Sequence, residues 1–271
     1  MLAGRNDVTF PASIVKRMEE YSDDGKTMQG AYGYRWRKHF GFDQITTIVE
    51  ALKKNPTCRR QVMSMWDAAN DLRLQDSKDL PCNTQIYFSR NNEKQELDMT
   101  VCNRSNDIVW GALGANAVHM SFLQEFMALW IGCGIGRYYQ FSNNMHLYLD
   151  HHEELMNEVA NEAFPSNQRD RYDYYSQGLV SYRPMMPPLS GDKFFDAADF
   201  LLSGEDLPLG VHSRFMSGVA GPMLKAIRNY KSQPKETRGM TSLQILLDMP
   251  PNLDWTLACC NWLQKRMEKN G

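Results

Sequence analysis

Three features are missing from the sequence: paired cysteine motifs, long apolar runs, and an excess of charge of one sign. None of its six cysteines forms a CxxC pair, so the sequence predicts neither a zinc knuckle nor a disulfide framework. The formal net charge of -2 and the pI near 6.3 give no electrostatic reason to expect a nucleic-acid or membrane partner. No apolar run approaches the roughly 18 residues of a membrane span, and no signal peptide opens the chain. We therefore expect a cytoplasmic protein with mostly reduced cysteines that binds no nucleic acid and no membrane.

No internal repeat or low-complexity linker divides the chain, which could form one large domain or two small ones. We favour one domain, because 271 residues can bury a substantial core. Seventeen methionines and 11% aromatic residues indicate a large, adaptable interior rather than any particular cofactor.

Two stretches of the chain hold a candidate nucleophile and a candidate anion clamp. Cys82 follows a proline at the mouth of an apolar segment, and Arg104 opens a polar run. Between them, apolar and polar residues alternate around a turn at residues 91–92, which is the pattern of a half-buried β-hairpin. Such a hairpin carries Cys82 near one end. Arg104, Ser105 and Asp107 then lie just beyond the other end.

Hydrophobic periodicity and turn residues predict the remaining elements. Helices are expected over residues 12–21, 44–54 and 116–131, and strands over residues 61–66, 138–141, 145–149 and 180–183. Residues 30–37 are expected to form an aromatic, basic loop, and residues 169–175 a polar connection. From Phe194 onward the chain is expected to be helical, ending in a helix over residues 253–267.

Three further clusters have ordinary structural explanations. Arg59 and Arg60 precede a predicted strand and could reach a ligand or a neighbouring subunit, although an arginine pair is more often simply solvated. The run from Asp150 to Glu154 lacks helical ligand spacing such as HExxH, so we interpret it as a polar helix start and expect no metal site. The glycines at 132–136 follow a helix instead of a strand, so they do not indicate a phosphate-binding loop.

Several separated motifs occur in an order that resembles the thymidylate synthase superfamily, which includes the pyrimidine nucleotide hydroxymethylases. The motifs are Tyr32-Gly-x-x-Trp-Arg37, Asp43-Gln44, Asn55-Pro-x-x-Arg-Arg60, Pro81-Cys82, Arg104-Ser-x-Asp107 with a following Gly111 and Asn116, and His146-x-Tyr148. Each motif alone is a weak signal, but their joint order over residues 2–154 is specific.

The resemblance implies an α+β fold of the thymidylate synthase type. We expect a mixed, largely antiparallel sheet covered by helices on one face, with the other sheet face forming the dimer interface. Residues 1–184 would form the nucleotide-binding core. Residues 185–271 would form a helical C-terminal extension packed on that core.

The resemblance also implies that Cys82, Tyr32 and Asp107 are catalytic. Position C5 of a pyrimidine becomes nucleophilic only after something adds at C6, and a cysteine thiolate such as that of Cys82 is suited to the addition. Arg104 could lower the thiol pKa and hold the substrate phosphate through a bidentate contact. Asp107 is expected to anchor the folate cofactor, 5,10-methylenetetrahydrofolate, and a water network.

The nucleotide-binding set that the resemblance implies is Arg59, Arg60, Arg104, Ser105, Asn116, His146 and Tyr148. Arg59 and Arg60 match a phosphate-binding pair that reaches the partner's site in the family, so we expect a homodimer. Ser105 would add a hydroxyl donor to the phosphate, and His146 with Tyr148 would bind the sugar hydroxyl. Asn116 matches the residue that reads the base. A carboxamide can donate to O4 and accept from N3–H of uracil, so Asn116 favours dUMP over dCMP.

Our first expectation for the activity is one-carbon transfer to C5 of dUMP with reduction, which makes dTMP. The alternatives are a dUMP or dCMP hydroxymethylase, as used by viruses with modified DNA, and a non-catalytic nucleotide-binding homologue. The form Arg104-Ser-Asn-Asp107 favours a hydroxymethylase, as does the absence around residues 21–25 of the indoles that shield the activated methylene from water in synthases.

Both ends of the chain favour the non-catalytic alternative. The family's general-base glutamate and first phosphate-binding arginine would precede Leu2, so we expect a fragment or a shorter form. Residues 266–271 do not resemble the tail that closes over the folate in synthases.

Overall fold

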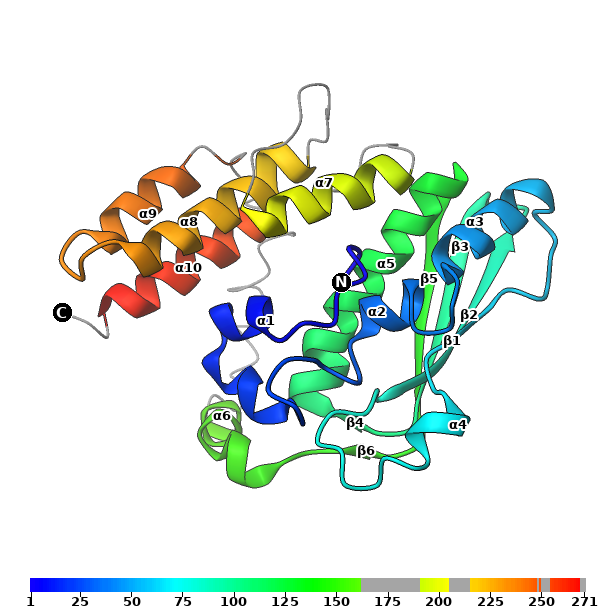
Figure 1. Ribbon diagram of the computed structural model, residues 1–271, viewed down its shortest axis with the longest axis horizontal. Coiled ribbons are helices and arrows are strands. Elements are labelled where there is room, and N and C mark those ends of the chain that lie inside the picture. The colour runs from blue at the N-terminus through cyan, green and yellow to red at the C-terminus, as the bar shows by residue number, and fades with distance from the viewer. Residues whose placement is uncertain (162–190, 205–214, 248, 250–253, 269–271) are drawn as a thin grey trace. The chain divides into compact units, whose positions relative to one another are not determined.

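The computed structural model describes residues 1–161, 191–204, 215–247, 249 and 254–268 (Figure 1). These residues form two compact units, of which the first contains residues 1–152 and 191–196 and the second the other described residues. The predicted domain boundary after residue 184 lies outside the described residues, as do the connection and strand expected at 169–175 and 180–183.

A four-stranded sheet forms the centre of the first unit. Its strands, in order across the sheet, are β1 (Val62–Ser64), β2 (Asn83–Asn91), β3 (Glu96–Asn103) and β5 (Gly134–Ser142). β1 and β3 run antiparallel to β2, whereas β5 runs parallel to β3. The mixed, largely antiparallel sheet is therefore confirmed, and β2 and β3 are the predicted hairpin. The strand expected at 61–66 is shorter, and the one expected at 138–141 is longer.

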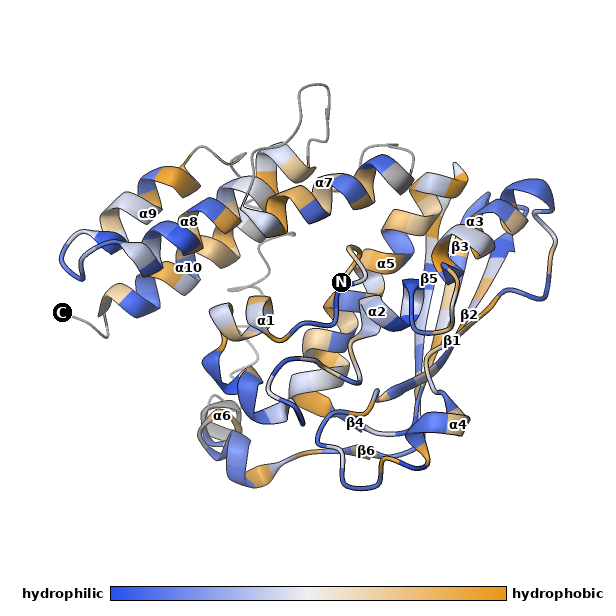
Figure 2. Ribbon diagram, viewed as in Figure 1, coloured by the Kyte–Doolittle hydropathy of each residue, from blue (hydrophilic) through white to orange (hydrophobic). Residues whose placement is uncertain are grey.

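Helices cover one face of this sheet. Alternate residues of β3 are buried on that face, where α5 (Asn116–Ile131) contacts both β3 and β5. α3 (Gln44–Lys54) packs against α5 and β1, and it buries the four apolar residues predicted for its inner face: Ile45, Ile48, Val49 and Leu52. Apolar residues recur along α5 in Figure 2, consistent with its place in the core. Gly132 ends α5 in the left-handed conformation, with φ of +86°.

The opposite face of the sheet exposes a row of large side chains. Val62 on β1 lies beside Tyr87 on β2, which lies beside Thr100 on β3, which lies beside Tyr139 on β5. The two tyrosines and the valine are 41–46% exposed, and Phe141 in the next row is 67% exposed. In the first unit these four large side chains are therefore uncovered.

Residues 30–37, expected to be a loop, instead contain helix α2 (Tyr32–Arg37). Arg35 and Trp36 are each 1% exposed, so these side chains belong to the core and are not held out for a ligand. Gly33 is required by chain packing, because a Cβ at this position would overlap the backbone of Met1. The expected loop is therefore wrong for residues 32–37, because the glycine allows close backbone approach within a helix as well as in a loop.

Two other predicted elements are shorter than expected. The helix expected over residues 12–21 is divided into α1 (Thr9–Ile14) and the 3-10 helix η1 (Lys16–Tyr21), because Val15 between them is extended. In the strand expected at 145–149, only Met145–His146 forms β6.

Short elements connect the sheet to the helices. β6 pairs in parallel with β4 (Asn106–Asp107), and an irregular helical segment η2 (Ile108–Ala115) leads from β4 into α5. Helix α4 is Ala68–Asp71. Helix α6 (Leu149–Asn161) contains the polar run 150–154, so the predicted helix start is confirmed.

The described part of the C-terminal third is mostly helical, as predicted. It contains α7 (Gly191–Ser203), η4 (Met216–Ala220), α8 (Gly221–Ser232), α9 (Arg238–Leu246) and α10 (Asp254–Glu268). The second unit has its own hydrophobic core, made by Val219, Ala226, Tyr230, Leu246, Met249 and Leu263. Across the described ranges, no helix has the length and apolarity that a membrane span needs. Nor do three or more His, Cys, Asp or Glu side chains there gather in a way that could hold a metal ion.

Candidate active site

The hairpin brings Cys82 and Arg104 together. Cys82 immediately precedes β2, and its half-buried thiol follows the buried Pro81. The backbone N–H of Arg104 donates to the carbonyl oxygen of Cys82 at 2.9 Å. Because the outer ends of the two strands of a hairpin meet, residues 22 positions apart in the chain become neighbours.

Hydrogen bonds hold the Arg104 side chain beside the residues that precede Cys82. Its Nε donates to the Pro81 carbonyl at 3.1 Å, and its Nη2 donates to the Leu80 carbonyl at 3.2 Å. The guanidinium also lies 5.4 Å from the ring centre of Trp66. Since an arginine has five N–H donors, two contacts to carbonyls leave donors for an anion. Arg104 is therefore positioned for the predicted role of anion clamp.

Burial raises the pKa of the Cys82 thiol above its ordinary value. The positive charge of Arg104 lowers the pKa, the carboxylate of Asp79 raises it, and a hydrogen bond with Tyr32 lowers it. The sequence argument gave the correct sign for the effect of Arg104, but desolvation of the thiol outweighs that effect. The Cys82 thiol is therefore mostly protonated at neutral pH.

We expect the alkylation of Cys82 by iodoacetamide to keep accelerating as the pH rises past the ordinary thiol pKa of 9.0, because the thiolate is the reacting form. Asp79→Asn should lower the pKa of Cys82 and speed alkylation at about pH 8, whereas Arg104→Gln should slow it. Rates are measured by mass spectrometry of the Cys82 peptide. Cys58 is an internal control, since a hydrogen bond from the backbone of Arg60 lowers its thiol pKa. Equal rates for the two cysteines at neutral pH would contradict the prediction.

Asp79 is a site residue that the sequence argument missed. Its Oδ2 accepts a hydrogen bond from the backbone N–H of Gly30 at 2.8 Å, across 49 residues of sequence. Burial raises the pKa of this carboxyl group, and the Gly30 hydrogen bond opposes the shift. The charge of this carboxylate also raises the pKa of both Cys82 and Tyr32.

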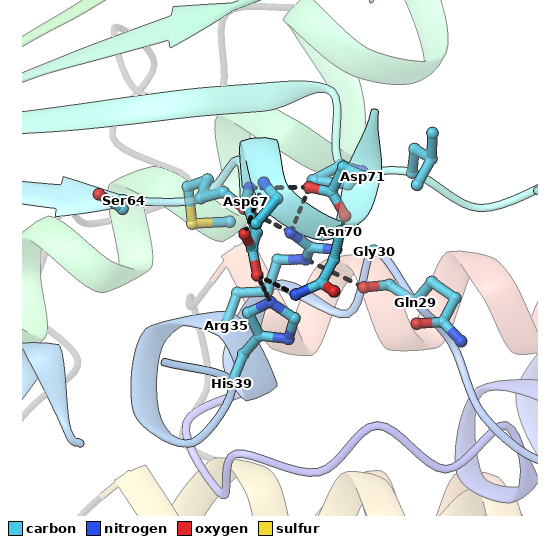
Figure 3. A network of polar contacts seen from close by, with 12 residues as sticks. Gln29, Gly30, Arg35, His39, Ser64, Asp67, Asn70 and Asp71 are labelled. Atoms are coloured by element: carbon cyan, nitrogen blue, oxygen red, sulfur yellow. Dashed lines mark hydrogen bonds and ion pairs between the residues drawn. The ribbon is translucent and has the colours of Figure 1, made fainter. Parts of the chain in front are cut away.

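Figure 3 shows the ion pair that holds the Gly30 segment in place. Arg35 donates to both carboxylate oxygens of Asp71 at 2.7 and 2.8 Å, and both side chains are 1% exposed. Arg35 Nε also donates to the Gln29 carbonyl at 3.0 Å. The Gln29 carbonyl and the Gly30 N–H belong to the same peptide group. The ion pair therefore also fixes the N–H group that donates a hydrogen bond to Asp79.

Tyr32 and Asn116 complete the surroundings of the thiol. The Tyr32 hydroxyl donates to Asn116 Oδ1 at 3.0 Å, and the same hydroxyl is hydrogen-bonded to Cys82. Burial, followed by the charge of Cys82, raises the Tyr32 pKa, so the phenol remains protonated. His119 packs edge-on against the Tyr32 ring at 6.2 Å between ring centres. Burial lowers the His119 pKa to about 4, so this ring is neutral at neutral pH.

Asn116 is held by a second layer of amides. Its Nδ2 donates to Asn106 Oδ1 at 3.0 Å, and Asn106 is fully buried. Asn106 Nδ2 donates in turn to Gln140 Oε1 on β5 at 3.1 Å. A Cβ at Gly111 would overlap the Asn106 oxygen, so glycine is needed for this close approach.

The remaining predicted residues lie in two places. Asp107 is 8% exposed, and its carboxylate accepts from the backbone N–H groups of Trp110 at 2.5 Å and Tyr148 at 3.4 Å, so it caps η2. The pairing of β4 with β6 brings Ser105 Oγ to 3.5 Å from His146 Nδ1. The rings of His146 and Tyr148 contact edge-on, with 4.8 Å between centres.

Arg59 and Arg60 are exposed residues between α3 and β1. Within the described part of the chain, no hydrogen bond or ion pair joins either side chain to the residues around Cys82. The structure thus brings Cys82, Arg104, Tyr32 and Asn116 together within one subunit and leaves the arginine pair apart from them.

Comparison with known proteins identifies relatives of this chain. The family model described as thymidylate synthase matches residues 4–170. A deoxyuridylate hydroxymethyltransferase of Pseudomonas phage M6 is 44% identical over 270 residues, which cover 98% of this chain and 74% of that protein. A deoxyuridylate hydroxymethyltransferase of Bacillus phage SP01 is 36% identical over 177 residues, which cover 62% of this chain and 46% of that protein.

More distant matches include thymidylate synthases. The enzyme of Streptococcus pyogenes serotype M3 (strain ATCC BAA-595 / MGAS315) is 33% identical over 184 residues, 63% of each chain. Among solved structures, thymidylate synthase A from Bacillus subtilis matches 59% of this chain and 58% of its own, with a TM-score of 0.48 and 24% identity. The chain thus spans 74%, 46% and 63% of the lengths of the M6, SP01 and Streptococcus proteins, respectively.

Proposed function

Because this chain belongs to the thymidylate synthase family, we propose that it is a deoxyuridylate hydroxymethyltransferase, which converts dUMP into 5-hydroxymethyl-dUMP. The observation that carries the proposal is the 44% identity to the Pseudomonas phage M6 enzyme over 98% of this chain. This reverses the order of our sequence-based expectations, in which methyl transfer came first. The Arg104-Ser-Asn-Asp107 motif and the lack of indoles near residues 21–25 support the same conclusion.

Cys82 is the nucleophile in this proposal. Its thiolate forms a bond to C6 of the pyrimidine, which makes C5 nucleophilic. 5,10-Methylenetetrahydrofolate would supply the one-carbon unit at the oxidation level of formaldehyde. C5 would bond to this carbon and lose its proton. The bond from the carbon to the folate nitrogen would then break and release tetrahydrofolate, water would add to the exocyclic methylene that remains, and the C6–S bond would break to restore the thiolate. The product keeps the oxidation level of formaldehyde, so no hydride is consumed.

The other residues bind the nucleotide. Arg104 and Ser105 are proposed to hold the phosphate, and His146 with Tyr148 the deoxyribose hydroxyl. Asn116 is proposed to read the base. Its amide uses one N–H on Asn106 and one oxygen lone pair on Tyr32, so one donor and one acceptor remain for O4 and N3–H of uracil.

The surface next to Asn116 fits a folate. Trp110 and Leu113 on η2 are 64% and 79% exposed, and an exposed indole can stack on a planar heterocycle. Asp107 lies at the start of the same helical segment and is proposed to contribute its carboxylate to the folate site. These residues suit a ring system that carries hydrogen-bond donors at one edge.

We also propose a homodimer. The uncovered row on the sheet, formed by Val62, Tyr87 and Tyr139, offers an apolar surface to a second copy of the chain. Arg59 and Arg60 lie shortly before β1, the strand at the edge of the sheet, so they are near the proposed interface. There they are proposed to bind the phosphate in the partner's site.

The test is mass analysis of the nucleotide after incubating the protein with 5,10-methylenetetrahydrofolate and dUMP. We expect 5-hydroxymethyl-dUMP and tetrahydrofolate, with no dihydrofolate. dCMP is the matched substrate and should react much more slowly. A methylated product with one equivalent of dihydrofolate would instead establish a synthase. Binding of dUMP without any product would support the non-catalytic alternative.

A further inference from the structure

A directed chain of hydrogen bonds starts at a backbone carbonyl and ends at the Asn116 amide. Gln140 Nε2 donates to the Ala112 carbonyl oxygen at 3.0 Å. Gln140 Oε1 accepts from Asn106 Nδ2 at 3.1 Å, and Asn106 Oδ1 accepts from Asn116 Nδ2 at 3.0 Å. In each of the three amides, the nitrogen donates to the next group toward Ala112. The oxygen accepts from the preceding group, which lies on the side of Tyr32.

The direction of this chain is fixed by its first member. A backbone carbonyl oxygen can only accept, whereas a carboxamide has one donating end and one accepting end. Reversing Asn116 would place two oxygens together unless Asn106 reversed as well. Reversing Asn106 would require Gln140 to reverse, and Gln140 would then turn an oxygen toward the Ala112 oxygen. Two facing acceptors in a buried place are strongly unfavourable.

Among the described residues, one other side chain accepts a hydrogen bond from Asn106 Nδ2. It is Ser142, whose Oγ lies 3.2 Å from that nitrogen. A hydroxyl both donates and accepts, and it can rotate to suit either orientation of Asn106. Ser142 therefore contributes a hydrogen bond without fixing the direction of the chain. This difference between Gln140 and Ser142 provides a matched pair for experiment.

The orientation of Asn116 decides which pyrimidine the site accepts. Uracil presents a donor at N3 and an acceptor at O4, whereas cytosine presents an acceptor at N3 and a donor at N4. An asparagine that can turn over binds either base equally well, because turning exchanges its oxygen and nitrogen. Only an asparagine whose orientation is imposed can reject cytosine.

We propose that Gln140 and Asn106 are specificity-determining positioning residues, which select uracil over cytosine by imposing the orientation of Asn116. The inference rests on the proposed function in one respect, namely that Asn116 faces the base. Neither residue needs to touch the nucleotide. Both act through the amide that does.

Gln140→Met tests the proposal, because methionine is close in size and removes the amide. Binding of dUMP and dCMP is measured by titration calorimetry, which requires no turnover. We expect the parent to prefer dUMP by at least about 100-fold, since a site built around specific hydrogen bonds rejects a base that leaves them unpaired. In Gln140→Met this preference should fall at least about tenfold, with dUMP binding weakened less than dCMP binding is strengthened.

Two further variants separate orientation from general damage. Ser142→Ala removes a hydrogen bond to the same atom of Asn106, and its dUMP preference should stay within about twofold of the parent. Asn106→Asp in the Gln140→Met background should restore the preference, because a carboxylate can only accept and so again imposes the orientation of Asn116. Circular dichroism confirms that each variant is folded.

An unchanged preference in Gln140→Met would overturn the proposal, as would an equal loss of affinity for both nucleotides or an equal effect of Ser142→Ala. A parent without a preference for dUMP would also overturn it. If the parent prefers dUMP and the variants behave as expected, the inference stands even if the product is methylated or absent. In that case only the proposed function fails. A parent that binds neither nucleotide contradicts both.

Discussion

Replacement of Cys82 by alanine is expected to abolish product formation, with a loss of at least about 10⁴-fold in turnover, because Cys82 is the group proposed to form the bond to C6. Binding of dUMP should change little, since the phosphate and base contacts are proposed for other residues. Product is measured by mass spectrometry, and binding by titration calorimetry. Cys102→Ala is the matched control, because this half-buried thiol on β3 has no proposed chemical role. Residual turnover above about 1% in Cys82→Ala would contradict the assignment.

The same variant tests whether two subunits share each site. We mix Cys82→Ala protein with protein in which Arg59 and Arg60 are both alanine, after reversible dissociation of the two. If the arginines serve the partner's site, half of the dimers are mixed and each contains one intact site, so about a quarter of the parent activity returns. If they serve their own subunit, every site lacks an essential group and no activity returns.

Arg35→Met is expected to lower the free energy of unfolding by about 3–5 kcal/mol, because it leaves the buried Asp71 carboxylate without its cation. The backbone carbonyls of Met65 and Gln29 also lose their donor. Urea unfolding of the full chain, followed by circular dichroism, measures the loss. Lys53→Met is the control: its ion pair with Glu50 is exposed and should contribute about 0.5 kcal/mol or less.

A double replacement distinguishes the effect of the unpaired charge on stability from the effect of the changed side-chain volume. In Arg35→Met with Asp71→Leu, neither charge remains buried, so most of the lost stability should return. A double variant no more stable than Arg35→Met would contradict the explanation. So would a loss below about 1 kcal/mol in the single variant. Because Gln29 and Gly30 depend on Arg35, the single variant should also weaken the Gly30 hydrogen bond to Asp79.

Elements with a strong local pattern were predictable from the sequence. The hairpin followed from alternation around a polar turn, and residues 44–54 and 116–131 followed from helical periodicity with clear stop signals. The helix at residues 32–37 was not predictable in this way. Its Arg35 is buried only because Asp71, 36 residues later, supplies the opposite charge. No local pattern contains that information.

The same distinction between local patterns and distant contacts applies to the site residues. Cys82, Arg104, Tyr32 and Asn116 belong to motifs in a recognisable order, and the structure brings all four together. Asp79 and Gln140 were missed because their partners lie far away in the sequence, 49 residues to Gly30 and 34 residues to Asn106. Both act through hydrogen bonds across the fold, and single residue types such as Asp or Gln carry no signal of such contacts.

The buried, protonated state of Cys82 also bears on how the protein survives oxidants. Peroxide reacts with thiolates far faster than with thiols, so a cysteine whose pKa is raised by burial forms sulfenic acid slowly. The Tyr32 hydroxyl is shared between Asn116 Oδ1 and the Cys82 sulfur, and its hydrogen bond lowers the thiol pKa less than burial raises it. Cys82 is therefore expected to react slowly with oxidants in the resting protein.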